Sequence, residues 1–162
     1  MIQPHIDNGD IKLVLDKFSE DWRPDEAFNN LKAYLDEKKH IDAVICANDG
    51  TAFGAIQALQ EYGLAGKVPV SGQDAELPAC QRIVHGLQTV TVYKPIGLLA
   101  KKAAEIAVSL ARGKNVEASQ TVDNGAVKVP SYLIEPIAVT KANMEETIIK
   151  DGFHSREDVY FQ

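Results

Sequence analysis

Segments typical of β-strands and of α-helices alternate along most of this chain and are joined by short connections. Apolar runs typical of strands occur at residues 11–15, 41–47, 68–71 and 89–93. Helices are predicted between and after these runs, at residues 24–39, 51–62, 78–85 and 96–112. Because parallel strands need a crossover between them, this order is typical of a parallel β-sheet flanked by helices. The sequence therefore predicts an α/β fold.

The C-terminal part of the chain departs from this alternation. Residues 121–139 are expected to be extended and rich in turns, with an Asn-Gly turn among them. A final helix is predicted after Asn143, which with Glu146 three residues later forms a pattern like a capping box. Residues 157–162 fit the E-x-x-Y-x-Q pattern cleaved by a tobacco-etch-type protease, so we treat them as a candidate vector-derived remnant outside the fold.

Composition excludes several classes of protein. The 162 residues carry a net charge of −6, which argues against nucleic acid or an anionic membrane surface as the main partner. The two cysteines, Cys46 and Cys80, have no ligand-type spacing, so neither a zinc site nor a disulfide framework is expected. The most apolar stretch, residues 96–110, is too short and too often interrupted by charge to span a membrane. The first residues lack the features of a signal peptide, which taken alone favours the cytoplasm.

Polar and aromatic residues follow each predicted strand, where open α/β sheets bind their ligands. In chain order they are Phe18, Trp22, Asn48, Asp49, Gln73, Asp74 and Lys94. An amide, carboxylates, an ammonium group and an aromatic ring suit a neutral polyhydroxylated ligand. Its hydroxyls need fixed donors and acceptors, and its C–H face packs on an aromatic ring.

Each of these residues also has a purely structural interpretation. Asp49 or Asn48 would cap the helix that follows, and Asp74 would cap the next one. Lys94 would be a solvated strand end and Trp22 a hydrophobic staple over its own helix. Catalytic interpretations have less support, because the cysteines lie within a strand and a helix, the histidines have no paired spacing, and no phosphate-binding glycine motif is present. The sequence thus predicts a binding protein rather than an enzyme, with neither metal nor cofactor.

Four motifs carry a resemblance that covers nearly the whole chain. They are NDGTAFGAIQAL at 48–59, SGQDAE at 71–76, TVTVYKP at 89–95 and IIKDGFH at 148–154. In this order and at these separations they resemble the D-xylose-binding members of the ribose-type family of periplasmic sugar-binding proteins. The resemblance implies a type I periplasmic-binding-protein fold, with two lobes that close around a pentose by a hinge motion. It also implies delivery of the sugar to an ABC importer or to a membrane sensor kinase.

Carried over by position, the resemblance assigns sugar contacts to four residues. Trp22 would be the aromatic platform under the sugar, and Asn48 would donate to and accept from its hydroxyls. Asp74 would accept hydrogen bonds from hydroxyls, and Lys94 would donate one at the hinge. Because the ligand role passes to Asn48, Asp49 is left as the expected helix cap.

The chain is long enough for only one of the two lobes that the resemblance implies. It begins with Met1 inside what the family uses as a helix, so the first lobe and the opening strand-helix-strand of the second are expected to be missing. Residues 1–94 would form most of the C-terminal lobe, 95–139 the hinge-crossing helix and an extended return, and 140–156 the C-terminal helix and tail. The apolar helix 96–111 would then pair with the missing N-terminal half or self-associate. The implied setting is extracytoplasmic, since a signal sequence would have stood upstream.

Two other functions fit parts of the pattern. A phospho-acceptor receiver domain of a two-component system also ends its strands with Asp, with Ser or Thr, and with Lys-Pro, as Asp49, Ser71 and Lys94 do here. The acidic pair that would hold Mg²⁺ after the first strand is missing from its expected place. The effector-binding domain of a LacI-type repressor shares the ribose-type architecture, but no helix-turn-helix is evident. The motifs at 71–76 and 89–95 favour the sugar receptor.

Overall fold

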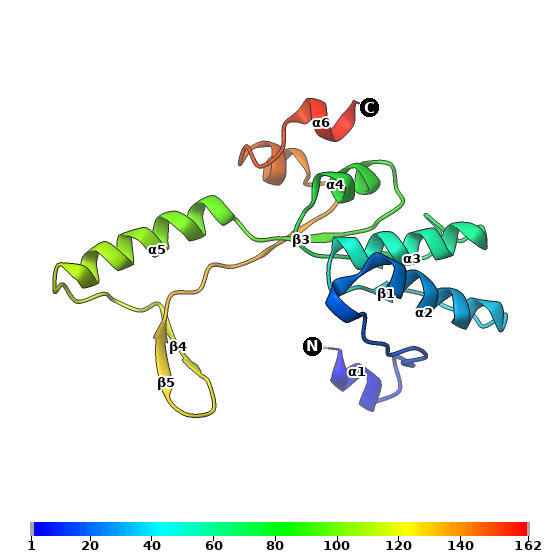
Figure 1. The fold of residues 1–162 in the computed structure, drawn as a ribbon, viewed down its shortest axis with the longest axis horizontal. Coiled ribbons are helices and arrows are strands. Elements are labelled where there is room, and N and C mark those ends of the chain that lie inside the picture. Colours follow the sequence, from blue (N-terminus) through cyan, green and yellow to red (C-terminus); the bar gives the residue numbers. More distant parts are fainter. Residues whose placement is uncertain (1, 162) are drawn as a thin grey trace. The chain divides into compact units, whose positions relative to one another are not determined.

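The structure is a computed structural model that describes residues 2–161. The described residues form two compact units, which we call unit 1 (residues 2–92 and 138–161) and unit 2 (residues 93–137). Figure 1 traces their helices and strands. Of the four residues expected to contact a sugar, three lie in unit 1 and Lys94 lies in unit 2.

Unit 1 contains a small parallel β-layer and several helical segments. Its helical segments are α1 (Gln3–Asp7), η1 (Glu20–Trp22), α2 (Pro24–Asp36), α3 (Asp49–Glu61), α4 (Leu77–Val84), η2 (Glu145–Ile149) and α6 (Arg156–Tyr160). Its strands are β1 (Val44–Ile45) and β2 (Val70–Ser71), while β3 (Thr91–Tyr93) and β6 (Ile137–Val139) lie at its boundaries. The strands keep the predicted order but are shorter than their apolar runs.

The strands of unit 1 run parallel. Val44 of β1 lies opposite Val70 of β2. Beyond β2 the layer continues through a parallel bridge between Ser71 and Val90, and the Gly72 N–H donates to the Val90 carbonyl at 2.9 Å. The carboxyl ends of these segments therefore meet at one edge, which confirms the predicted α/β architecture.

Helices α2 and α3 lie side by side and supply much of the core (Figure 1). Leu31 and Leu35 of α2, on the predicted apolar face, are each only 3% exposed. The fully or almost fully buried residues of α3 include Ala52, Ala55, Ile56, Ala58 and Leu59. A Cβ atom added to Gly54 of α3 would lie 1.9 Å from the carbonyl oxygen of Pro24, so the close approach of the two helices depends on glycine.

The strand predicted at residues 11–15 is not formed, and that prediction is wrong. Within the described chain the segment joins no sheet, and the Ile11 N–H donates to the His5 carbonyl instead (2.9 Å). An apolar run becomes an inner strand only where both of its faces are covered. Here Leu15 packs on the core, whereas Leu13 is 52% exposed.

Asn143 does not cap the last predicted helix. The segment Glu145–Ile149 (η2) is a π-helix that follows Met144 without a side-chain cap. The Asn143 Oδ1 instead accepts from the Thr140 N–H at 2.7 Å, and its Nδ2 donates to the Ala138 carbonyl at 2.9 Å. The short amide side chain thus closes the turn after β6, because Asn bonds nearby backbone as readily outside a helix as at its end.

Residues 157–160, which the sequence placed in a candidate vector-derived remnant, belong to α6 (Arg156–Tyr160), and α6 packs on α4. Val159 is fully buried, and Gln81 of α4 donates a hydrogen bond from Nε2 to the Asp158 carbonyl at 2.8 Å. Ser155 caps α6 by accepting from the Asp158 N–H at 3.0 Å. This segment is therefore integrated into unit 1, except for Gln162, which lies outside the described residues.

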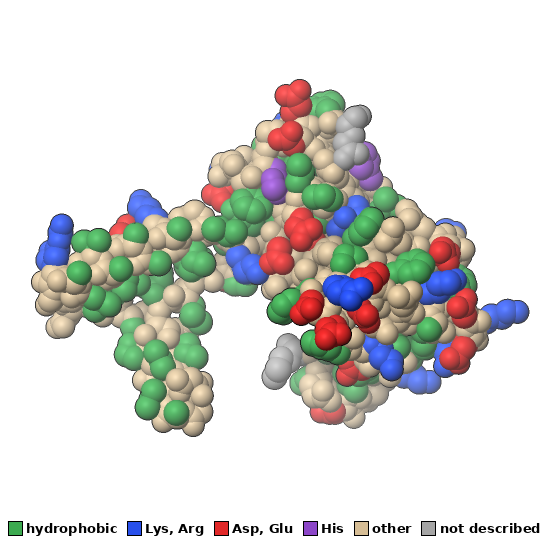
Figure 2. Space-filling model, viewed as in Figure 1, with side chains coloured by type: hydrophobic (Ala, Val, Ile, Leu, Met, Phe, Trp, Pro, Cys, Tyr) green, Lys and Arg blue, Asp and Glu red, His purple; other side chains and the backbone are tan. Residues whose placement is uncertain are grey.

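Unit 2 consists of one long helix and a hairpin. The helix is α5 (Ile96–Ala111), and β4 (Gln120–Asp123) pairs antiparallel with β5 (Lys128–Ser131) across the predicted Asn-Gly turn. No residue of α5 is buried in the described chain, and hydrophobic side chains are visible along it (Figure 2). The exposed ones include Ile96, Leu98, Leu99, Val108 and Leu110, at 49–61%. Among the described residues, no helix has the length and apolarity needed to cross a bilayer.

Candidate functional site

The loop between β1 and α3 is organised by Asn48. Its Oδ1 accepts a hydrogen bond from the Thr51 N–H at 2.9 Å, and the Asn48 N–H donates to the Thr51 Oγ1 at 3.2 Å. These reciprocal bonds make a capping box in which Asn48 is the N-cap of α3. The expectation that Asp49 caps this helix is therefore wrong.

Asp49 is instead a fully buried carboxylate. It accepts hydrogen bonds from Gln88 Nε2 (2.8 Å), Thr91 Oγ1 (2.9 Å) and the Glu76 N–H (3.0 Å). Burial raises the pKa of the Asp49 carboxyl above its ordinary value, and the bonds from Gln88 and Thr91 act in the opposite direction. Its partners come from the loop before α4 and from the stretch that leads into β3, so this one side chain joins both segments.

Gln88 is fixed in one orientation by Arg82. The Arg82 Nε donates to the Gln88 Oε1 at 3.0 Å, while the Arg82 Nη2 donates to the Asp49 carbonyl at 2.9 Å. The amide of Gln88 therefore has to present its NH₂ group to Asp49. Sequence reasoning missed both Gln88 and Thr91. A hydroxyl group in a strand predicted to be buried could have marked Thr91 as a hydrogen-bonding residue. No feature of the sequence marks Gln88 in this way.

The loop between β2 and α4 holds Asp74. The Asp74 N–H donates to the Val92 carbonyl at 2.9 Å, and the Ala75 N–H donates to the Thr91 Oγ1 at 3.1 Å. Asp74 itself is half-buried. It does not cap α4, whose N-cap is Glu76. The capping interpretation of Asp74 is therefore wrong.

The loops of Asn48 and Asp74 are joined directly. The Asp49 N–H donates to the Gln73 carbonyl at 2.9 Å, so the residue after Asn48 is bonded to the residue before Asp74. Gly72 also permits close approach, because a Cβ there would lie 2.1 Å from the Asp49 Oδ1. The structure thus brings these two predicted segments together.

The segment of Trp22 reaches the same edge of unit 1. Trp22 ends η1, and two residues later Pro24 begins α2. The Pro24 carbonyl lies against Gly54, and the Pro24 Cγ lies 3.8 Å from where a Cβ on Gly50 would stand. The start of α2 therefore lies beside the start of α3, next to its N-cap, and Trp22 is 63% exposed there.

Lys94 follows β3 and is an exposed residue of unit 2. Phe18, the other aromatic residue that the sequence placed after the first predicted strand, is 86% exposed. The structure brings together the segments of Trp22, Asn48 and Asp74 in unit 1, whereas Lys94 belongs to unit 2. The assignment of all four side chains to a ligand remains a prediction.

Left-handed backbone gathers at the candidate residues. The non-glycine residues with positive φ among those described are Asp21, Trp22, Lys38, Asp74 and Ala75. All but Lys38 either are candidate residues or adjoin one, and φ is +101° at Asp74 and +54° at Trp22. Such conformations cost about 1–3 kcal/mol each and tend to cluster at ligand sites. Neither the composition nor the spacing of the residues predicted this backbone strain.

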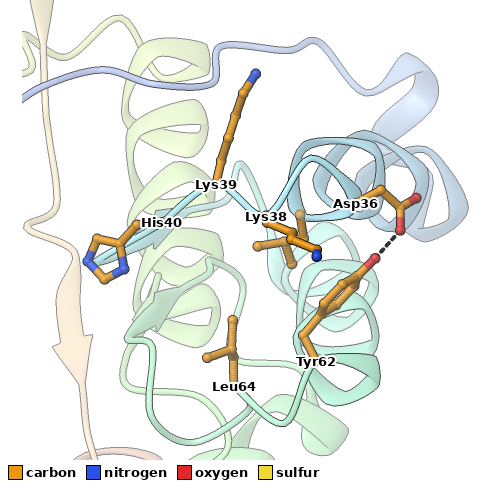
Figure 3. A pocket seen from close by; sticks show the side chains of 7 residues that line it. Asp36, Lys38, Lys39, His40, Tyr62 and Leu64 are labelled. Carbon is orange, nitrogen blue, oxygen red and sulfur yellow. Dashed lines mark hydrogen bonds between the residues drawn. The ribbon is translucent and has the colours of Figure 1, made fainter.

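A shallow hollow of about 480 Å³ lies elsewhere in unit 1 (Figure 3). It is lined by Leu35, Asp36, Lys38, Lys39, His40, Tyr62 and Leu64. Tyr62 points to Asp36 and donates a hydrogen bond to it. These residues lie in the last turn of α2 or follow α2 and α3, at the ends of the helices opposite to Asn48, so the hollow contains no candidate residue.

The two thiols are expected to be unreactive in the folded chain. Burial raises the pKa of both Cys46 and Cys80 to about 12, and Cys80 is fully buried. With an ordinary pKa of 9.0, their thiolate fraction at pH 8 is lowered about a thousandfold. Iodoacetamide labelling followed by mass spectrometry should leave both unmodified in buffer and label both in guanidinium. Rapid labelling of native Cys46 would contradict this prediction.

The receiver-domain interpretation finds no support in the geometry. Its phospho-acceptor would be Asp49, whose carboxylate is fully buried behind three hydrogen-bond donors. A phosphodonor has to reach the acceptor oxygen in line. In the described part of the chain, no group of three acidic, histidine or cysteine side chains is placed to hold a metal ion.

Comparison with known proteins agrees with the fold. The chain is 51% identical over 161 residues to the D-xylose-binding periplasmic protein of Haemophilus influenzae, covering 99% of this chain and 48% of that protein. It is 49% identical over 160 residues to the protein of the same name from Escherichia coli, again covering 48% of that protein. The chain thus spans about half the length of the curated relatives it matches.

Solved structures share this architecture. A carbohydrate transporter solute-binding protein from Chloroflexus aurantiacus, in complex with D-glucose, superimposes with a TM-score of 0.80 at 26% identity, covering 97% of this chain and 54% of that one. The sequence model of the periplasmic binding protein domain matches residues 2–115. Since that match extends over more than half of a chain with this α/β fold, the chain belongs to the periplasmic binding protein domain family.

Proposed function

We propose that this chain is most of the C-terminal lobe of an extracytoplasmic receptor that binds D-xylose or a related pentose. The receptor closes around the sugar by a hinge motion and presents it to an ABC permease or to a sensor kinase in the membrane. It binds the sugar without transforming it and needs no cofactor. The two relatives named D-xylose-binding periplasmic protein support this assignment.

The observation that carries the proposal is the meeting of three loops at one edge of unit 1. The bond from the Asp49 N–H to the Gln73 carbonyl (2.9 Å) joins the loops of Asn48 and Asp74, and the start of α2 brings in Trp22. An amide, a carboxylate and an indole from three segments are the groups that a pentose requires, since its hydroxyls both donate and accept.

The proposal gives Asn48 and Asp74 different roles. The Asn48 Oδ1 is already engaged, because it accepts from the N–H and the Oγ1 of Thr51 at 2.9 and 2.8 Å. Its Nδ2 is the group that donates to a sugar oxygen. The Asp74 carboxylate accepts from sugar hydroxyls in charge-assisted bonds. The exposed indole of Trp22 stacks on the C–H face of the ring.

The proposal includes Lys94 because of the resemblance. Its ammonium group donates a hydrogen bond to the sugar at the hinge. Lys94 directly follows β3 and precedes Pro95. An ammonium group can only donate, so its partner on the sugar is a hydroxyl oxygen.

The exposed side chains of α5 provide the surface for the missing N-terminal half. Their large apolar groups are 49–61% exposed, and contiguous apolar surface of this kind marks an interaction site. The chain covers 48% of each curated relative named above, so about half of a receptor of that length lies outside it. Without that half, the 96–111 helix self-associates.

Titration calorimetry with D-xylose tests the proposal. The chain is titrated alone and after mixing with the separately produced half of the Haemophilus influenzae relative that lies outside the match. We expect micromolar or tighter binding by the mixture and weak or no binding by the chain alone, because half of the sugar contacts and the closing motion belong to the other lobe.

Light scattering on the same samples gives the state of assembly. A one-to-one complex in the mixture and an oligomer of the chain alone are expected. A mixture that assembles but does not bind D-xylose would contradict the proposed ligand, and micromolar binding by the chain alone would contradict the half-site. A stable monomer of the chain alone would contradict the role of α5.

A further inference from the structure

Most backbone polar groups of the loop Gln73–Glu76 make hydrogen bonds to other parts of unit 1 or to the start of α4. The Gln73 carbonyl accepts from the Asp49 N–H, and the Asp74 N–H donates to the Val92 carbonyl, each at 2.9 Å. The Glu76 N–H donates to the Asp49 Oδ2 at 3.0 Å. This loop contains the candidate ligand Asp74, so its anchors determine the backbone from which that carboxylate projects.

Ala75 is the most tightly held residue of this loop. Its N–H donates to the Thr91 Oγ1 at 3.1 Å, and its carbonyl lies 2.8 Å from the His154 Nε2, which donates to it. Ala75 is fully buried. With φ of +54° at Ala75 and +101° at Asp74, the loop adopts a conformation that a free chain would avoid.

Thr91 and Asp49 form one continuous hydrogen-bonded unit. The Thr91 hydroxyl accepts from Ala75 and therefore directs its own proton to the Asp49 Oδ2, at 2.9 Å. Both side chains are fully buried, and the described side chains include no buried polar atom without a partner. A fully satisfied buried network of this kind makes a local structure rigid.

We infer that Asp49 and Thr91 are positioning residues, which hold the Gln73–Glu76 loop in its left-handed conformation and thereby set the place of Asp74 for the sugar. Neither residue is assigned a ligand contact. The inference rests on the proposed function for its consequence in sugar binding. The bonds that support it, however, are independent of any ligand.

The test compares Thr91→Val with Thr91→Ser. Valine keeps the volume of threonine but removes the acceptor of the Ala75 N–H and one donor to Asp49, whereas serine keeps the hydroxyl. Thr121→Val makes the same change on exposed β4 of unit 2 and is the matched control. Hydrogen exchange of the backbone amides by NMR is measured for each variant of the full chain, together with D-xylose affinity after mixing with the complementary half.

In Thr91→Val, the Ala75 amide should exchange about tenfold faster relative to the Leu59 amide of α3, because one buried hydrogen bond is lost. The D-xylose dissociation constant should rise about tenfold, which is a loss of binding free energy similar to that of one hydrogen bond. Thr91→Ser and Thr121→Val should match the parent chain in both measurements. A general loss of stability would speed the exchange of both amides together, so the ratio separates positioning from mere stabilisation.

Each result decides one of the two proposals. If the Ala75 to Leu59 ratio is unchanged in Thr91→Val, the positioning role is overturned. The same holds if the ratio rises while D-xylose affinity stays at the parent value. If the parent mixture assembles and binds no D-xylose, the proposed ligand fails, and the exchange ratio still determines whether Thr91 holds the loop. Should Thr91→Val fail to fold, Asp49→Glu, which retains the carboxylate but displaces its oxygens, is measured in the same way.

Discussion

Replacing Gly54 with alanine should destabilise unit 1 by about 3 kcal/mol or more, because the new methyl group cannot be accommodated. A Cβ at this position would lie 1.9 Å from the Pro24 carbonyl oxygen and 3.1 Å from the Phe28 nitrogen. Both are backbone atoms of α2, so no side-chain rotation relieves the overlap. The helices would have to separate, and Leu31 and Leu35, now 3% exposed, would lose part of their cover. Chemical denaturation followed by circular dichroism measures the loss.

Gly97→Ala is the matched control for this substitution. Gly97 also lies in a helix, α5, but nothing stands within 4 Å of its would-be Cβ. Alanine favours a helix over glycine by about 1 kcal/mol, so this variant should be as stable as the parent chain or slightly more so. Equal stability of the Gly54→Ala and Gly97→Ala variants would contradict the close approach of α2 and α3.

Asp49→Asn should be the second most damaging of the substitutions considered, with a loss of about 2–3 kcal/mol. The carboxylate accepts from Gln88, Thr91 and the Glu76 N–H, and an amide has only one oxygen to offer. Its NH₂ group must face one of these donors. Gln88 cannot turn over to accept from it, because its Oε1 is already bound by the Arg82 Nε at 3.0 Å.

Asp42→Asn provides the comparison, since the Asp42 side chain is 90% exposed and bonds to His40 at the surface. That change should alter the free energy of unfolding by less than about 0.5 kcal/mol. Thermal and denaturant unfolding of both variants against the parent chain gives the two differences. An Asp49→Asn variant as stable as Asp42→Asn would show that the buried network contributes little.

Local sequence signals were enough to predict most of the helices and the edge at which the candidate loops meet. Helix α2 begins at Pro24 as predicted, and the glycines after α3, α4 and α5 all have positive φ, as expected for residues that end helices. The rule that ligands bind beyond the carboxyl ends of parallel strands then selected the loops of Asn48 and Asp74, and the structure joins those loops.

Interactions between distant residues were not predictable in the same way. Asp49 bonds to Gln88 and Thr91, which are 39 and 42 residues away, and an Asp beside a helix start looks the same whether it caps the helix or lies buried. The strands are also shorter than their apolar runs. Strand length depends on which other elements pack against the run, and the run itself carries no information about them. Asn143 is a second example of a residue whose partner was not predictable. Its amide oxygen accepts from the Thr140 N–H and does not cap η2.

The hydrogen bond from His154 to the Ala75 carbonyl has a consequence for biosynthesis. It joins residues 79 positions apart, and Val159 completes the same packed region beside α4. A nascent chain therefore exposes α4 to chaperones and proteases until ribosomes have translated it through residue 159. Premature termination between the β4–β5 hairpin and His154 would release a product with an unfinished loop, which cellular quality control would remove.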